Sequence, residues 1–260
     1  MRSLSIAASG MSAQNLNVEV IANNIANSNT TAFKRGLPQF ADLIYQVEKT
    51  AGVPNQGNAG GIPETEQVGL GVQTVAISTL NTQGPLTQTG NQLDVALSGR
   101  GWFQVQGPNN QTLYTRAGNF GMNAQGQLVT QDGYQVLPSI TFPTGTTTIQ
   151  INTTGAIFAG NGGPLSQVGQ MQIATFVNDA GLQALGNNLY QETAAAGNPQ
   201  VQNPGNPGCA LTQQFYLEGS NVDPVQEITN LITAQRNYEM NGKVITAADE
   251  MWQVITKNNL

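Results

Sequence analysis

The fold of this chain is decided by residues 220–260, which read SNVDPVQEITNLITAQRNYEMNGKVITAADEMWQVITKNNL. From Leu231 onward, apolar and small side chains recur at alternating intervals of three and four, at Leu231, Ala234, Tyr238, Asn241, Ile245, Ala248, Trp252 and Ile255. This spacing is that of a coiled-coil seam. The stripe is narrow and has polar residues on both sides, so it predicts a helix that needs a partner helix to cover it.

The start of the chain offers that partner helix. Its larger apolar residues recur at intervals of seven, with one more between them, at Leu4, Met11, Val18, Ile21 and Ile25. The helix is predicted from Ser3 to about Asn27, because the Asn- and Ser-rich run that follows Ala22 favours caps and turns over helix. We therefore expect the two ends to form a two-helix coiled-coil stem. Its uncovered edges predict self-assembly rather than a closed monomer.

The start of the last helix carries its own signal. Asn221-Val222-Asp223-Pro224 places a capping residue and a proline where a helix begins, so Asn221 is expected to cap the helix. Asp223 and Glu227 lie near the positive end of the helix dipole, and Lys257 lies near its negative end.

Between the two helices the period of the sequence changes to two. Alternating runs begin at Val72 and are separated by turn signals such as Asn123-Ala124-Gln125-Gly126 and Asp132-Gly133, which predicts many short strands. Residues 40–45 are expected to add a helical turn. The Gly-, Asn- and Pro-rich residues 46–71 are expected to be a connecting stretch without structure in the isolated monomer.

These patterns predict an α+β fold in which a two-helix coiled-coil stem carries a central all-β domain. The predicted division is a terminal helical core domain at residues 1–45 and 216–260, a connecting stretch at 46–71 and a central β domain at 72–215.

Composition excludes several classes of function. Charged residues make up 9% of the chain, the formal net charge is −6, and histidine is absent. The acidic balance argues against nucleic-acid binding, and the lack of histidine removes the commonest general base and metal ligand. No apolar run approaches the roughly 18 residues that span a bilayer, so no membrane insertion is expected. The N-terminus lacks the apolar core of a cleaved signal peptide.

No arrangement of residues predicts catalysis. Glu64 with Glu66, and Asp249 with Glu250, are paired carboxylates. The first pair falls in the connecting stretch, and the second lies on the solvated side of the last helix or at a contact between subunits. Acid–base catalysis needs buried, perturbed carboxylates. The single cysteine, Cys209, has no histidine to activate it. We expect no catalytic, cofactor-binding or metal-binding residue.

Three long stretches resemble the flagellar basal-body rod and hook axial proteins. The first reads ANNIANSNTTAFKR (residues 22–35), the second LDVALSGRGWFQV with YTRAGNF (93–105 and 114–120), and the third SNVDPVQEITNLI with AQRNYEMN (220–232 and 234–241). The resemblance runs nearly end to end. It assigns the family's motif residues to Asn23, Asn24, Asn27, Phe33, Lys34, Arg35, Asn221, Val222, Asp223, Gln235, Arg236, Tyr238 and Glu239.

Within the family, the length and the stretch at 46–71 are similar to the members that build the distal rod. The resemblance implies a structural, non-enzymatic subunit of a rigid helical tube that transmits torque from motor to hook and encloses the export channel. Implied partners are further copies of the chain, the proximal rod proteins, the hook protein and the peptidoglycan and outer-membrane ring bushings, with the flagellar export apparatus in transit. The implied location is the periplasm-spanning rod, reached without a cleaved signal peptide.

The apolar stripes of the two helices also predict where the copies pack. The helix seam is expected to be the subunit-packing surface, formed by Leu4, Met11, Val18, Ile21, Ile25, Leu231, Ala234, Tyr238, Ile245, Ala248, Trp252 and Ile255. Two alternatives stay open at this point: a proximal rod protein of the same family, and an extracellular β-domain binding module on a coiled-coil stalk. The stalk predicts a discrete small oligomer, whereas a rod predicts open-ended tubes.

Overall fold

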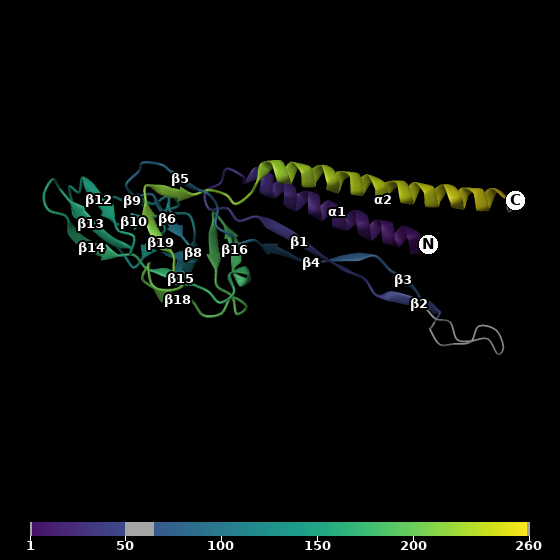
Figure 1. The fold of residues 1–260 in the computed structure, drawn as a ribbon, viewed down its shortest axis with the longest axis horizontal. Coiled ribbons are helices and arrows are strands. Elements are labelled where there is room, and N and C mark those ends of the chain that lie inside the picture. The colour runs from purple at the N-terminus through teal and green to yellow at the C-terminus, as the bar shows by residue number, and fades with distance from the viewer. Residues whose placement is uncertain (1, 50–64, 259–260) are drawn as a thin grey trace. The chain divides into compact units, whose positions relative to one another are not determined.

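The computed structural model describes residues 2–49 and 65–258 of the chain (Figure 1). Its contacts divide into two compact units. Unit 1 comprises Met1–Ala26, Gly36–Ser78 and Asp223–Leu260, and unit 2 comprises residues 27–35 and Thr79–Val222. The combination of two helices with a many-stranded region confirms the predicted α+β class. The boundaries of these units differ from the predicted domain boundaries at residues 45, 71 and 215. The predicted division into domains stays a prediction.

Unit 1 contains both helices, α1 (Arg2–Ala26) and α2 (Pro224–Asn258). The two helices pack side by side (Figure 1). They are antiparallel, since Leu4 near the start of α1 shares a hollow with Trp252 late in α2, and Asn24 late in α1 bonds Glu227 early in α2. The bounds of α1 match the predicted helix within a residue at each end. The description of the pair as a coiled coil stays a prediction.

Four strands complete unit 1. β1 (Gly36–Asp42) pairs with β4 (Val72–Thr79), and β2 (Tyr45–Lys49) pairs antiparallel with β3 (Glu66–Gly69). The helical turn expected at residues 40–45 was therefore wrong: β1 runs to Asp42, because its backbone finds a partner in β4. The prediction that the connecting stretch has no structure was wrong for residues 46–49 and 66–69, which form paired strands. Its centre, residues 50–64, lies outside the described residues.

Gly71 brings the β3–β4 corner against α1. Its φ of +125° is one that side chains with a Cβ avoid, and an added Cβ would lie 2.3 Å from the Ser9 hydroxyl oxygen. Ser9 Oγ also accepts the Val72 backbone N–H at 3.3 Å. Only glycine satisfies both the backbone conformation and the close approach at this corner.

Gly71→Ala is expected to release this corner from α1, with a local destabilisation of about 1–3 kcal/mol. Hydrogen exchange at the Val72 amide, which should speed up, measures the effect. Gly242→Ala is the matched control, because it adds the same methyl group within unit 1 at a position where an added Cβ has no atom within 4 Å, and it leaves the Val72–Ser9 hydrogen bond in place. Equal exchange rates in Gly71→Ala and wild type would contradict the account.

Unit 2 is built on a sheet of nine strands. Seven follow the order β16-β17-β8-β7-β11-β10-β9, and β15 pairs with both β7 and β18. The bounds are β7 Trp102–Gln106, β8 Thr112–Thr115, β9 Gly121–Met122, β10 Leu128–Val129, β11 Gln135–Leu137, β15 Ile173–Thr175, β16 Gln183–Gly186, β17 Leu189–Gln191 and β18 Gln200–Gln202. The predicted turn at Asp132-Gly133 joins β10 to β11, which pair antiparallel.

Smaller sheets complete unit 2. One has the order β12-β13-β14, and two pairs join β6 to β19 and β5 to β20. The bounds are β5 Leu86–Gln88, β6 Val95–Ser98, β12 Thr148–Ile151, β13 Ala156–Gly160, β14 Ser166–Gln170, β19 Leu211–Gln214 and β20 Tyr216–Glu218. Short 3-10 turns occupy Pro108–Asn110 and Asp179–Gly181.

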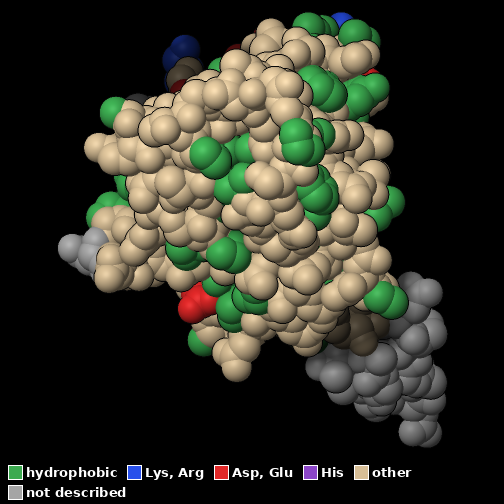
Figure 2. Space-filling model, turned by 90° about the vertical axis from the view of Figure 1, so that its left-hand side faces the viewer, with side chains coloured by type: hydrophobic (Ala, Val, Ile, Leu, Met, Phe, Trp, Pro, Cys, Tyr) green, Lys and Arg blue, Asp and Glu red, His purple; other side chains and the backbone are tan. Residues whose placement is uncertain are grey.

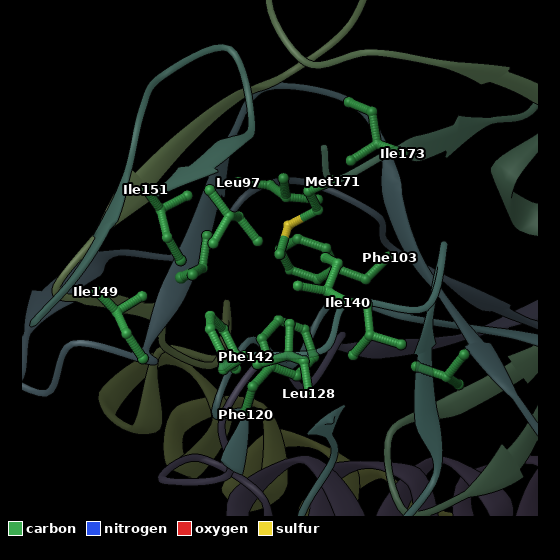
Figure 3. Close-up of a cluster of buried hydrophobic side chains, with 14 of the residues drawn as sticks. Leu97, Phe103, Phe120, Leu128, Ile140, Phe142, Ile149, Ile151, Met171 and Ile173 are labelled. Carbon is green, nitrogen blue, oxygen red and sulfur yellow. The ribbon is translucent and has the colours of Figure 1, made fainter. Parts of the chain in front are cut away.

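Strand β7 separates the two apolar cores of unit 2. Successive side chains of a strand point to opposite faces of the sheet. Phe103 enters the larger core, where the side chains of Leu97 and Met171 point toward it (Figure 3). Trp102 enters the smaller core, where the centroid of its ring lies 4.8 Å from the centroid of the Tyr190 ring. Unit 2 thus has two apolar cores of its own.

Candidate functional site

The two outer motif stretches meet in unit 1 at a buried amide and carboxylate. Asn24, on α1, donates from Nδ2 to the Gly36 carbonyl at 2.9 Å and to Glu227 Oε2 at 3.2 Å, and its Oδ1 accepts the Gly36 N–H at 2.9 Å. Asn24 is 2% exposed and Glu227 1%. A buried polar group is costly unless it is hydrogen-bonded. This pairing therefore fixes the register of α1 against α2 at this end.

A second buried cluster lies within unit 2 and centres on Glu218. Its Oε1 accepts Lys34 Nζ at 2.5 Å and the Gly84 N–H at 3.0 Å, and its Oε2 faces Arg116 Nη1 at 3.4 Å. Lys34 Nζ also donates to the Thr82 carbonyl at 2.8 Å. The side chains of Lys34 and Glu218 are fully buried and that of Arg116 nearly so. The cluster joins residues far apart in the sequence.

The cluster holds two cations against one carboxylate. Burial lowers the pKa of Lys34 from its ordinary 10.5, and the ion pair with Glu218 partly raises it again. Burial likewise lowers the pKa of Arg116, whose guanidinium lies 5.7 Å from the centre of the Trp102 ring and donates to the Gly99 carbonyl at 2.7 Å. The ring and carbonyl supply part of the electrostatic stabilisation that water would give.

Asn221 does not cap α2, and the prediction that it does was wrong. Its Oδ1 accepts the Arg35 N–H at 2.7 Å, and its Nδ2 donates to the carbonyls of Leu80 and Thr82 at 2.8 and 3.1 Å. The cap is Asp223, whose Oδ1 accepts the Val225 N–H at 3.0 Å. Asp223 directly precedes Pro224, so its carboxylate reaches the free amides of the first turn, whereas the Asn221 amide is held by other backbone groups.

The predicted seam residues differ in burial. Ile21, Ala234 and Ala248 are buried; Leu4, Met11, Val18, Ile25, Leu231 and Ile245 are half-buried; Tyr238 and Trp252 are exposed; and the side chain of Ile255 lies outside the described ones. The helices approach each other closely at Gly10, where an added Cβ would lie 2.8 Å from Asn241 Nδ2. The predicted seam thus buries Ile21 and two alanines, and leaves its two largest side chains, Tyr238 and Trp252, exposed.

The predicted motif residues also separate by burial. Asn24, Lys34 and Val222 are buried; Asn27, Phe33, Arg35 and Asn221 are half-buried; Asn23, Asp223, Gln235, Arg236, Tyr238 and Glu239 are exposed. The sequence reasoning missed Arg116, Glu218 and Glu227. Charged residues are rarely fully buried, so the sequence alone suggests that these three residues lie on the surface. The sequence signal that could have led to these residues is Lys34 of the motif. It predicts a carboxylate partner but does not indicate which carboxylate this is.

Among residues 2–49 and 65–258, no group of three or more His, Cys, Asp or Glu side chains could hold a metal ion. Asp249 and Glu250 are exposed, which leaves them without the burial that tunes a catalytic carboxylate. No helix of the described residues is both long and apolar enough to cross a membrane.

The chain is similar to flagellar axial proteins over its whole length. Family models match residues 4–34 (flagella basal body rod protein), 96–159 (flagellar hook protein FlgE/F/G D1 domain) and 213–258 (flagellar basal body rod FlgEFG protein C-terminal).

Individual relatives give the same result. Flagellar basal-body rod protein FlgG of Agrobacterium fabrum is 55% identical over 260 residues, with 99% of each chain covered. FlgG of Caulobacter vibrioides is 49% identical over 259 residues, again with 99% of each covered. FlgF of the same organism is 35% identical over 240 residues, covering 90% of this chain and 88% of that protein.

Proposed function

Because the chain belongs to the flagellar basal-body rod protein family, we propose that it is a distal rod subunit that self-assembles into a rigid helical tube. This tube transmits torque from motor to hook and encloses the export channel. The observation that carries the proposal is the end-to-end likeness to FlgG. The weaker likeness to FlgF in an organism that has both proteins supports the distal assignment over a proximal one.

The surface of α2 supports self-assembly. A helix of a monomer normally covers its large apolar side chains. α2 instead exposes Val225, Ile228, Ile232, Tyr238, Met240, Val244, Met251, Trp252 and Val254. So many exposed large apolar side chains on one helix are typical of a surface that a partner covers. Neighbouring copies are proposed to cover it, together with the half-buried row Leu4, Met11, Val18 and Ile25 of α1.

Unit 2 supplies a surface with little charge. Asp132 is the only charged residue between Ala117 and Asn178. Figure 2 shows scattered hydrophobic side chains and few charged ones on the face that it draws. Such a surface forms few ion pairs. We propose that it turns inside the peptidoglycan and outer-membrane ring bushings with little adhesion. The proximal rod and hook proteins are proposed as axial neighbours in the periplasm-spanning rod, and no enzymatic role is assigned.

The experiment that tests this function is Trp252→Asp. A buried, unpaired carboxylate in a packed interface is strongly unfavourable, so tubes seen by electron microscopy of concentrated protein, and swimming of a strain carrying the variant, should both be lost. Unit 2 should stay folded, which the fluorescence of Trp102 reports because Trp102 and Trp252 are the only two tryptophans of the chain.

Gln226→Asp is the matched control, since it adds the same charge to the exposed first turn of α2, where the helix dipole favours it. It should assemble normally. A motile Trp252→Asp strain would count against the proposed packing. A discrete small oligomer of the wild-type protein, in place of tubes, would favour a binding module on a stalk.

A further inference from the structure

One side of the second half of α2 is an apolar row that contains two methionines. Its members are separated by four, three, four and three residues, which places them on the same side of the helix. They are Met240, Val244, Ala247, Met251 and Val254, and we call them the methionine row. All five are exposed, whereas the buried Ala234 and Ala248 lie on another side. Three of the five, with Glu250, line a hollow of about 580 Å³.

The two thioethers of the row are the most exposed among the methionines that the structure describes. Met251 keeps 61% of its surface exposed and Met240 keeps 54%, compared with 49% for Met122 in β9 and 0% for Met171 in the larger core of unit 2. Met11 on α1 is half-buried. Because an oxidant must reach the sulfur, oxidation of methionine follows exposure, and the two residues of the row react most readily.

We propose that Met240 and Met251 are oxidation sites, and that their conversion to methionine sulfoxide blocks assembly of the subunit. The oxidant is a peroxide. The thioether sulfur attacks one oxygen of hydrogen peroxide, the O–O bond breaks, and the other oxygen leaves as water. The sulfur loses two electrons and the peroxide gains two. Methionine sulfoxide reductases reverse the reaction with two electrons from thiols, which become a disulfide while the sulfoxide oxygen leaves as water.

The sulfoxide changes what the row can pack against. A thioether is apolar and adapts its shape to an irregular surface, whereas a sulfoxide is polar and costs free energy when it is buried without a hydrogen-bond donor. The other three members of the row are aliphatic and carry no polar side-chain group. The inference rests on the proposed function, because it takes the row to be part of the α2 surface that neighbouring copies cover.

Peroxide treatment of the free subunit tests the proposal. After treatment, catalase removes the hydrogen peroxide, and dithiothreitol reverses sulfenic acid or disulfide formed at Cys209 but leaves the sulfoxides in place. Peptide mass spectrometry gives the sulfoxide fraction at each methionine, which should grow faster at Met240 and Met251 than at Met11 or Met171. The protein concentration needed for tubes in electron microscopy should rise about ten-fold or more. Treatment with both sulfoxide reductases should restore assembly, which shows that the protein remained able to fold.

Met240→Leu with Met251→Leu is the resistant variant, because leucine has a similar apolar volume and no sulfur. Its assembly should change by less than about three-fold on peroxide treatment. Met122→Leu is the matched control: it removes an exposed methionine of unit 2 and should leave assembly as sensitive to peroxide as in wild type.

Three results would overturn the proposal. They are wild-type protein that assembles at its original concentration with both methionines oxidised, a doubly substituted variant that peroxide inactivates as it does wild type, and oxidation of the row no faster than that of Met11. Untreated wild-type protein that forms no tubes at any concentration would instead overturn the proposed function.

Discussion

Gly118→Ala should abolish the cooperative fold of unit 2. A Cβ added to Gly118 would lie 1.6 Å from the Val95 carbonyl oxygen and 2.7 Å from the carbonyl carbon, which are backbone atoms that no rotamer change can move. The Gly118 carbonyl accepts the Val95 N–H at 3.0 Å, and Val95 is fully buried in the larger core. The two backbones must separate to admit a methyl group. A loss of more than about 4 kcal/mol is expected.

The measurement is the thermal unfolding midpoint followed by Trp102 fluorescence in a Trp252→Phe background. Gly121→Ala is the matched control: it lies three residues away, has no atom within 4 Å of the added Cβ, and does not have a positive φ. Its free energy of unfolding should change by less than about 1 kcal/mol. A Gly118→Ala protein that unfolds with the wild-type midpoint would refute the close approach of these two segments.

Glu218→Gln is expected to destabilise unit 2 by about 3–5 kcal/mol at neutral pH, because it removes the carboxylate that the buried Lys34 and Arg116 share. The shape of the side chain is almost unchanged, so the loss is electrostatic. Glu192→Gln is the matched control, since Glu192 is exposed and contacts the Tyr114 hydroxyl rather than a cation. Denaturant unfolding of both variants gives the comparison. Equal midpoints would show that Glu218 does not neutralise the cluster.

The loss of stability that Glu218→Gln causes in unit 2 should also depend on pH. Burial lowers the pKa of Lys34 below its unfolded value of 10.5, and the variant lacks the ion pair that partly raises it. Between the lowered folded pKa and 10.5, the unfolded chain binds more protons than the folded one, so stability rises with pH in that window. The window extends further down in the variant. The difference in the free energy of unfolding between wild type and Glu218→Gln should therefore be smaller at about pH 10 than at about pH 7.

Much of the fold could be predicted from periodicity. The spacing of apolar residues after Leu231 and the Asn- and Ser-rich run after Ala22 predicted the two helices, and alternation after Val72 predicted strands; all were confirmed. These signals are local, because a helix or strand shows its buried side within a few turns or residues. The missed strands at 36–42 and 45–49 lack such a signal, since their pairing depends on β4 and β3, which follow in the chain.

The buried polar clusters could be predicted only in part. The motif stretches pointed to Asn24, Lys34 and Asn221, but not to what they contact. Lys34 and Glu218 are separated by 184 residues, and Asn24 and Glu227 by 203. Residues that pair across such a separation leave no local pattern in a single sequence. The sequence also does not distinguish a buried glutamate from a solvated one.

The sequence by itself determined the fold class, the two terminal helices and the family, because hydrophobic spacing and long motifs are properties of the chain order. The tertiary structure decided which charges are buried, which residue caps α2, and which sides of α2 stay uncovered. Those properties depend on contacts between residues far apart in the chain, and only folding brings such residues together.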